Sequence, residues 1–476
     1  MREKYETLTL AVLKDLCKDI GIKGYYSMSK DQIIDILVEK EKEEKEQKAN
    51  NTNNTNNAAP VEYTEKKVVE KAELPEEPTQ NARSKAVVGS GGFEQEYDPN
   101  LDSHKSAHGI VEIMSDGFGF IRSNNYLSGD NDVYISPGQI KRFGLRTGDI
   151  VTGNIKVKGE KEKFSALLYI TKINGMAPEV VAKRAKFEEM TPIFPDKKIK
   201  LEIPGAPVSM RIMDLICPVG KGQRGMIVSQ PKAGKTTLLK DIAHSILYSN
   251  KEMYMIILLI DERPEEVTDI KSAIKGENVE VIYSTFDETP EHHKKVAEMT
   301  VERARRLVES KKDVIILLDS ITRLTRAYNQ VIPPSGRTLS GGLDPAALHM
   351  PKKFFGAARN MKEGGSLTIL ATALVDTGSK MDDVVYEEFK GTGNMELVLD
   401  RKLSEKRVFP AIDIPKSGTR NEHLLLTSEE LAAITSLRRG FNGLKPEEAV
   451  DEVIDLFSKT KNNDEFVNTI NKMKRF

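Results

Sequence analysis

The sequence predicts an α/β protein whose main domain is built on a parallel sheet, with a small β-barrel before it and a helical module at the start. Two apolar runs, at residues 253–260 and 313–319, have the length and the charged ends of buried parallel strands. Residues 106–173 contain short strands separated by glycine turns, a pattern typical of a small barrel. Roughly the first forty residues instead show apolar positions at helical spacing.

Bulk composition limits the kinds of protein that this chain can be. Its 476 residues suggest about two to four domains. The formal net charge of −1 excludes a uniformly basic protein, so any surface for nucleic acid must be local. Cys17 and Cys217 are too far apart in sequence to suggest a disulfide framework or a metal site. No stretch resembles a signal peptide or a membrane span, so we expect a soluble, cytoplasmic protein with no membrane contact.

The front of the chain is typical of a helical module followed by a linker. Leu13, Leu16 and Ile20 lie on one face of a predicted helix, and the capping spacing from Ser29 to Gln32 predicts the start of a second. From residue 50 the sequence is Asn-rich, and then rich in proline, glutamate and glycine up to about residue 105. Such a segment cannot bury enough apolar surface to offset its chain entropy, so we expect a disordered linker. An inert linker is favoured over a self-associating tract.

An exposed aromatic surface is predicted on the barrel. The run DGFGFIR at residues 116–122 places Phe118 and Phe120 on one strand face, with glycines that leave the rings uncovered. A second strand, at residues 132–135, adds Tyr134. Rings interleaved with glycine and followed by Arg122 suit the stacking of unpaired bases. The rings could instead be core, but two of them flanked by glycine favour a binding platform of the OB-fold or cold-shock type.

A strand–turn–helix pattern predicts a phosphate-binding loop. Apolar residues 226–228 form the strand, residues 230–237 read QPKAGKTT, and apolar positions then recur at helical spacing. Backbone N–H groups at a helix N-terminus bind anionic oxygens. Lys235 would reach the β- and γ-phosphates, and the Thr236 hydroxyl would bind Mg²⁺. Ser229 stands where the strict pattern has glycine, and an ordinary turn with a surface lysine is the less favoured alternative.

Two acids that follow predicted strands complete a nucleotide site. Asp319 closes one apolar run, and we expect it to hold Mg²⁺ through water. Glu262 follows the other run and is the candidate base that orients the attacking water. Either acid alone could be an ordinary charged strand end, but their order after the loop predicts an ATPase of the RecA type. The capping spacing from Thr427 to Glu430 predicts the start of C-terminal helices.

Taken together, these motifs resemble those of one family, the bacterial transcription termination factor Rho. The resemblance rests on DGFGFIR, PKAGKTT, LLIDERPEEV and VIILLDSITRLTRAYN, and on the later motifs SGRTLSGG, DTGSKMD, EEFKGTGNMEL and KRVFPAIDIPKSGTR. It covers nearly the whole chain except residues 49–105, and the Asn-rich insertion is outside the shared pattern. It implies a homohexameric ring that threads RNA, translocates along it with ATP and dislodges RNA polymerase, with elongation factors as further partners.

The resemblance also assigns residues to sites. The implied catalytic set is Lys235, Glu262, Asp319 and Arg420, with Thr236 and Asp319 at the metal. The implied nucleotide contacts are Lys232, Ala233, Gly234, Lys235, Thr236, Thr237, Arg263, Phe409 and Arg407. Of these, Phe409 stacks on adenine, Arg263 links the RNA grip to the ATP site, and Arg407 and Arg420 reach the neighbouring subunit's nucleotide. The implied RNA contacts are Phe118, Phe120, Arg122, Asp132, Tyr134, Glu162 and Phe164 in the barrel, and Arg337, Thr338, Ser340, Thr377, Gly378 and Lys380 in the channel. Phe164 stands where the family usually has tyrosine.

These patterns divide the chain into five predicted parts. They are a helical module at 1–48, a disordered linker at 49–105, an OB-fold or cold-shock-like RNA-binding domain at 106–173, a connector at 174–205 and a RecA-like ATPase domain with C-terminal helices at 206–476. The predicted function is an ATP-dependent RNA translocase or helicase that binds pyrimidine-rich single-stranded RNA and terminates transcription.

Two alternative functions stay open at this stage. A catalytic subunit of a rotary ATP synthase shares the ATPase core and a front barrel, but it has no use for exposed Phe118 and Phe120. An RNA-binding chaperone with a vestigial ATPase domain would not need intact Lys235, Glu262 and Asp319.

Overall fold

The computed structural model describes Lys30, Gln32, Ile34 and residues 86–473, with gaps at 90–93, 123, 160–161 and 441–445. The chain forms two compact units, Met1–Gln80 and Asn81–Phe476. In the first unit the three described residues are helical and Ile34 is buried. The rest of the expected front module, and the Asn-rich segment up to residue 85, lie outside the described residues.

Part of the segment expected to be a linker forms strands. Strands β1 (Ala86–Val88) and β2 (Gln95–Tyr97) pair antiparallel, and the short helix η2 (Pro99–Leu101) leads into β3 (Asp102–Ile113). The side-chain amide of Gln95 both donates to and accepts from the backbone of Ile170, at 2.8 and 2.9 Å. The segment docks on the barrel through such polar contacts rather than through an apolar core of its own. Its composition therefore did not predict these strands, and the expected boundary at residue 105 falls inside β3.

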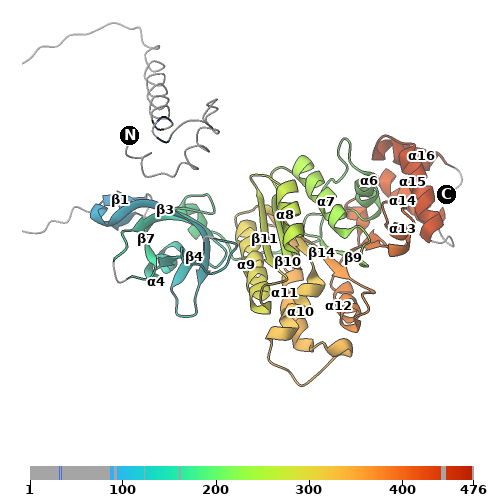
Figure 1. Ribbon diagram of the computed structural model, residues 1–476. Helices are drawn as coiled ribbons and strands as arrows, with labels where there is room; N and C mark the ends of the chain where they lie inside the picture. Colours follow the sequence, from blue (N-terminus) through green and yellow to red (C-terminus); the bar gives the residue numbers. More distant parts are fainter. Residues whose placement is uncertain are drawn as a thin grey trace, which may run out of the picture. The chain divides into compact units, whose positions relative to one another are not determined.

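The barrel is closed and has five strands in the order β3-β4-β5-β7-β6. The other strands are β4 (Gly119–Arg122), β5 (Val133–Ile135), β6 (Ile150–Lys156) and β7 (Ser165–Ile173), and helix α4 (Pro137–Phe143) follows β5. Side chains such as Val111, Ile135 and Val151 fill its interior. The structure thus confirms the predicted small barrel (Figure 1).

A connector leads from the barrel to the main domain. It contains helix α5 (Pro178–Ala182), the short helix η3 (Phe187–Glu189) and strand β8 (Pro192–Ile193). Strand β8 pairs with β13 (Arg359–Met361), which pairs with the central strand β14 (Ser366–Leu374), so the connector is joined to the main sheet.

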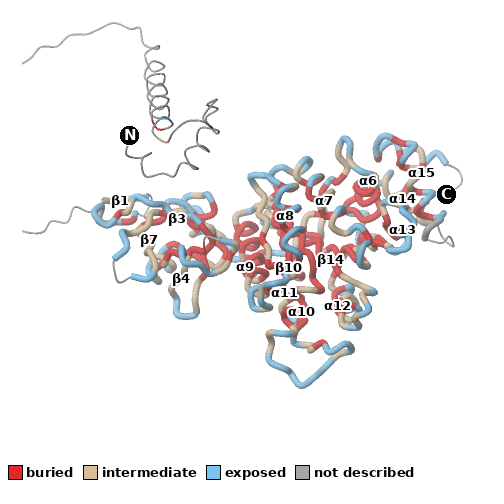
Figure 2. Tube along the Cα trace, in the orientation of Figure 1, coloured by how far each residue is buried: buried red, intermediate tan, exposed pale blue. Residues whose placement is uncertain are grey.

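The main domain is built on a mostly parallel sheet in the order β11-β10-β12-β14-β9-β15-β16. Its strands are β9 (Arg224–Ser229), β10 (Tyr254–Glu262), β11 (Val279–Thr285), β12 (Asp313–Asp319), β14 (Ser366–Leu374), β15 (Met395–Leu399) and β16 (Gly418–Thr419). Strands β10 and β12 are buried almost throughout, as Figure 2 shows for β10, and this confirms the two predicted parallel strands.

Helices cover both faces of this sheet (Figure 1). They are α6 (Val208–Ile216), α7 (Lys235–Ser249), α8 (Pro264–Ala273), α9 (Pro290–Glu309), α10 (Ile321–Val331), α11 (His349–Phe355), α12 (Lys380–Lys390), α13 (Arg401–Glu405), α14 (Ser428–Gly440), α15 (Pro446–Ser458) and α16 (Asn463–Lys472), with the short helices η4 (Ser340–Gly342), η5 (Pro345–Leu348) and η6 (Glu422–Leu424). Thr427 and Glu430 form the predicted reciprocal cap, with hydrogen bonds of 2.8 and 3.2 Å. Within the described residues, no helix is long and apolar enough to cross a membrane.

Candidate functional site

The predicted phosphate loop joins β9 to α7. Gly234 takes a φ of +90°, a conformation that side chains disfavour, and helix α7 begins at the next residue, Lys235. Ser229, the departure from the strict pattern, is the buried last residue of β9. The N–H groups of the first turn of α7 are therefore at the end of a sheet strand, the position in which helices bind anions.

Two acids from neighbouring strands lie against the loop lysine. Strands β10 and β12 pair in parallel, with Leu259 opposite Asp319, so their carboxyl ends bring Glu262 and Asp319 together. The Nζ of Lys235 is 2.6 Å from Asp319 Oδ1 and 3.2 Å from Glu262 Oε1. The structure thus gathers three of the four predicted catalytic residues at one point.

Burial and charge set the protonation of this group. Glu262 is 3% exposed, and its pKa is raised by burial and by the charge of Asp319. Burial would lower the pKa of Lys235, but the two carboxylates outweigh it and raise that pKa. The shift in the pKa of Lys235 favours its charged form, and the raised pKa of Glu262 increases the basicity of its carboxylate, the property that a general base requires.

Two further residues of this site were missed by the sequence reasoning. Thr372 on β14 donates to Asp319 Oδ1 at 2.8 Å and fixes that carboxylate. Arg323, in the first turn of α10, lies 3.8 Å from Glu262 Oε2 and 3.7 Å from Asp261. The position of Arg323 just after the strand that ends in Asp319 was a usable signal, whereas Thr372 lies in an apolar strand and carried none.

A cavity of about 410 Å³ opens beside the loop. Gly234, Thr237 and Leu238 line one side of it, and Phe409 lines another. Phe409 is 53% exposed although it is a large apolar ring, so its face is available to a ligand. Ala233 is buried in the loop, Thr236 is half-buried, and Lys232, Arg263 and Arg407 are exposed.

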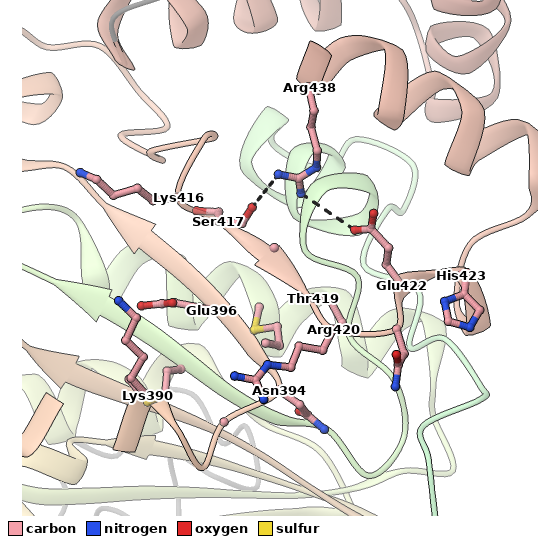
Figure 3. A pocket seen from close by; sticks show the side chains of 15 residues that line it. Lys390, Asn394, Glu396, Lys416, Ser417, Thr419, Arg420, Glu422, His423 and Arg438 are labelled. Atoms are coloured by element: carbon pink, nitrogen blue, oxygen red, sulfur yellow. Dashed lines mark hydrogen bonds and ion pairs between the residues drawn. The ribbon is translucent and has the colours of Figure 1, made fainter. Parts of the chain in front are cut away.

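Arg420 lies in a different pocket. This pocket measures about 540 Å³ and shares no lining residue with the cavity beside the loop. The backbone N–H of Arg420, just after β16, donates to the Asn394 carbonyl at 2.8 Å, and Figure 3 draws no dashed line to the Arg420 side chain. Arg438, which also lines the pocket, donates instead to the Ser417 carbonyl at 3.0 Å. One chain therefore does not bring Arg420 to Lys235.

The two predicted channel loops pack on each other. A Cβ on Gly341 would lie only 2.4 Å from the backbone nitrogen of Met381, so the loop of Arg337, Thr338 and Ser340 ends against the loop of Thr377, Gly378 and Lys380. Thr377 donates to Asp382 at 2.6 Å, and Asp382 also pairs with Arg326 at 2.6 Å. Arg337, Thr338, Ser340, Gly378 and Lys380 are exposed.

The predicted aromatic residues of the barrel form one cluster. Phe118 lies 5.8 Å from both Phe120 and Tyr134, and Phe164 lies 5.1 Å from Phe120, measured between ring centroids. All four rings are half-buried and none belongs to the barrel core. Their partial exposure on the outer face is what a stacking surface requires.

Of the polar residues predicted to bind RNA in the barrel, Arg122 and Asp132 lie at the aromatic cluster and Glu162 does not. Arg122 is buried beneath the Phe120 ring, with Cζ 4.8 Å from its centroid, and it pairs with Asp132 and with Glu112. Glu162 does not join them: its carboxylate accepts the N–H of Gly159 at 2.9 Å within its own loop. The structure thus gathers the predicted barrel residues except Glu162.

The glycines of DGFGFIR have structural roles that differ from the expected one. Gly117 makes a turn at φ +84°. A Cβ on Gly119 would lie 2.9 Å from the Glu112 carbonyl oxygen, so this glycine lets β4 approach β3 closely. They shape the strand pair rather than uncover the rings.

This fold and site define an ATPase with a RecA-like domain of the ATP synthase type, preceded by an OB-like barrel. The RNA-binding domain of the Rho termination factor family matches residues 107–179, and the nucleotide-binding domain of the ATP synthase alpha/beta family matches residues 209–419. A type III secretion ATPase from pathogenic bacteria shares the fold, with a TM-score of 0.51 at 21% identity over 67% of this chain and 93% of its own.

Relatives that align with about three quarters of the chain show which family it belongs to. The transcription termination factor Rho of Bacillus subtilis is 58% identical over 364 residues, which are 76% of this chain and 84% of the relative. The factors of Aquifex aeolicus and Pseudomonas aeruginosa are 54% and 55% identical, over 84% and 88% of their lengths. The chain belongs to the transcription termination factor Rho family. This membership favours the predicted function over the ATP synthase subunit and the RNA chaperone.

Proposed function

We propose that this chain is an RNA-dependent ATPase that assembles into a homohexameric ring, moves along nascent RNA as a helicase and releases RNA polymerase. One observation carries the proposal: the chain joins a nucleotide site with Lys235, Glu262 and Asp319 in contact to a barrel with an outward-facing aromatic cluster. Its relatives bear the name transcription termination factor. The partners are single-stranded RNA, RNA polymerase and its elongation factors, and the place of action is the cytoplasm.

The nucleotide site suits ATP with Mg²⁺. Thr236 and Asp319 supply the oxygen donors that Mg²⁺ prefers, and Mg²⁺ commonly combines one or two such donors with water and substrate phosphates. The bound metal would neutralise charge on the triphosphate. Lys235 binds a phosphate oxygen when it leaves its two acids, Phe409 stacks on the base, and Glu262 accepts a proton from the attacking water.

Two arginines without a side-chain partner among the described residues support assembly into a ring. Among the described residues, the side chains of Arg407 and Arg420 have no hydrogen-bond or ion-pair partner. Because Arg420 lies in a separate pocket from the loop, it serves the nucleotide of a neighbouring chain. An arginine supplied in this way stabilises the transferring phosphoryl group and is worth about 10³–10⁵ in rate.

The barrel supports a preference for pyrimidine-rich RNA. Asp132 is buried, and its Oδ1 has no hydrogen-bond partner among the described residues, although its Oδ2 pairs with Arg122. An acceptor beside a guanidinium can read a base edge that carries both a donor and an acceptor, and the close rings favour a small base. The exposed Arg337 and Lys380 of the channel loops would hold phosphates and let the motor pass over any sequence.

Transcript release tests the proposal. Elongating RNA polymerase complexes with a pyrimidine-rich transcript are incubated with ATP and either the wild-type protein or the Glu262→Gln variant. The wild type is expected to release the transcript, and the variant to bind RNA equally well without releasing it. Equal release by both proteins would contradict the role of ATP hydrolysis, and no release by the wild type would contradict the function itself.

A further inference from the structure

We propose that Lys295, on helix α9 of the ATPase domain, is a positioning residue for the RNA-reading surface of the barrel. It acts through Glu112 on Arg122. The inference rests on the proposed function, because it requires the barrel to bind RNA through its aromatic cluster. It makes the ATPase domain part of the base-reading site, which the sequence patterns placed wholly within the barrel.

The contacts form a continuous path from the helix to the aromatic cluster. Glu112 lies on β3 directly opposite Phe120 of β4, so the two side chains project from the same face of the strand pair. Its Oε2 accepts from Arg122 Nε at 2.8 Å, and its Oε1 accepts from the ammonium of Lys295. One buried carboxylate therefore joins the arginine under the Phe120 ring to a different domain.

Charge balance shows why a second cation is needed. The cluster holds two carboxylates, Glu112 and Asp132, and among the described residues of the barrel only Arg122 pairs with both of them. Lys295 supplies the second positive charge and makes the group neutral. Without it, a net negative charge would remain buried behind the rings, where it would repel RNA phosphates and draw Arg122 away from the base. Burial would raise the pKa of Glu112, but Lys295 and Arg122 outweigh it and lower that pKa.

The packing of α9 shows that this ion pair is held by the fold. The side chains of Lys295, Arg303 and Arg306 project from one side of the helix, given their spacing. Arg303 donates to Asn174 at the end of the barrel at 2.8 Å. A Cβ on Gly148 would lie 2.5 Å from the Glu302 backbone, so the barrel touches the helix directly. These contacts fix the register that places Lys295 opposite Glu112.

The alternative is that Lys295 and Glu112 form an ordinary surface salt bridge with no effect on Arg122, and this alternative predicts a different result. Lys295 is 36% exposed, and an exposed ion pair contributes little to binding or stability. Its loss would weaken RNA binding only through the general loss of positive charge, equally for every base. Lys294, the neighbouring residue on the same helix, provides the matched control, because it carries the same charge and, among the described residues, makes no hydrogen bond or ion pair with the barrel.

The test measures the binding of oligocytidylate and oligoadenylate of equal length to the full chain by fluorescence anisotropy. Lys295→Met is expected to weaken oligocytidylate binding by about tenfold, the scale of one charge-assisted hydrogen bond. Its effect on oligoadenylate should match the small effect of Lys294→Met. Lys295→Arg, which restores the charge, should recover the binding of oligocytidylate.

The possible results distinguish a failure of the proposed role of Lys295 from a failure of the proposed RNA binding by the barrel. Equal effects of Lys295→Met and Lys294→Met on both RNAs, with Phe118→Ala and Phe120→Ala still weakening binding, would overturn the role of Lys295 alone. Unchanged RNA binding in the double aromatic variant would overturn both the barrel site and this inference. A lower cytidine-to-adenosine ratio in Lys295→Met that Lys295→Arg restores would support it.

Discussion

The proposed ATP hydrolysis depends on single side chains: Lys235 at the start of α7, and Glu262 and Asp319 at the ends of β10 and β12. Lys235 and Glu262 are in contact, and we propose different roles for them, so their variants should fail differently. Lys235→Ala should weaken ATP binding, because a phosphate-binding cation is lost. Glu262→Gln should bind ATP normally and not hydrolyse it, because the base is lost. Equilibrium binding of a fluorescent ATP analogue and steady-state hydrolysis distinguish the two, and normal turnover by Glu262→Gln would show that another group is the base.

The raised pKa of Glu262 predicts a pH dependence. The base acts as a carboxylate, so hydrolysis should fall as the pH drops through its pKa. Burial and Asp319 raise that pKa above the ordinary 4.5, so the acid limb of the rate profile should have its midpoint above this value. The measurement is the maximal ATPase rate against pH, with circular dichroism as a control for unfolding. An acid limb at or below 4.5 would disagree with the buried, like-charged environment.

The aromatic cluster gives a prediction about RNA affinity. Phe118→Ala combined with Phe120→Ala should cost about 2–4 kcal/mol of binding free energy, the stacking of one to two bases. Phe194→Ala is the control, because this ring is 69% exposed on the connector and lies outside the cluster. Filter binding at several salt concentrations should show a slope near −0.7 per neutralised phosphate in both proteins. Unchanged affinity of the double variant would mean that the rings only support the barrel.

Among the secondary-structure elements, strands β1 and β2 lie in the predicted linker at residues 49–105. We therefore expect the part of the linker before β1 to be dispensable and the β1–β2 pair to stabilise the barrel. Deleting residues 49–85, whose composition predicts no fold, should leave assembly and RNA-stimulated ATPase intact. Extending the deletion through residue 97 should lower the melting temperature, because Gln95 would no longer bond Ile170 and Tyr97 would no longer pack on Tyr169. Differential scanning fluorimetry compares the two deletions. Loss of assembly in the shorter deletion would show that the Asn-rich segment has a structural role.

Elements with strong local patterns could be predicted from the sequence. Strand β12 coincides with the apolar run that ends in Asp319, and α7 begins at the lysine of the loop. Periodicity shows which face of an element is buried, but it does not show which element covers it. The bond between Gln95 and Ile170 and the pair of Lys295 with Glu112 join residues 75 and 183 positions apart, so no local pattern could indicate them.

The site divides in the same way. Lys235, Glu262 and Asp319 could be predicted, because each ends or begins an element that the pattern defines. Thr372 could not, since a threonine in a buried strand has no distinctive spacing. Glu162 was expected in the RNA site by resemblance, but the structure pairs it with its own loop. Its RNA contact stays a prediction.

At the scale of the whole molecule, the separation of Arg420 from Lys235 predicts that activity requires neighbouring chains. Arg420→Ala should abolish turnover while ATP and RNA binding persist. Mixing Arg420→Ala chains with Lys235→Ala chains creates some interfaces in which an intact Lys235 faces an intact Arg420. Such rings should regain part of the hydrolysis, although coordinated translocation need not return. Mixed rings that are no more active than either parent, after subunit exchange has been verified, would show that Arg420 does not act between chains.

We propose that RNA bound by this chain controls its ATP hydrolysis. The most direct measurement is the steady-state ATPase rate of the wild-type protein with and without a pyrimidine-rich single-stranded RNA. We expect slow hydrolysis without RNA, strong stimulation by that RNA, and loss of stimulation in the Phe118→Ala and Phe120→Ala double variant at limiting RNA. A rate that is the same with and without RNA, in a preparation that binds both RNA and ATP, would contradict it.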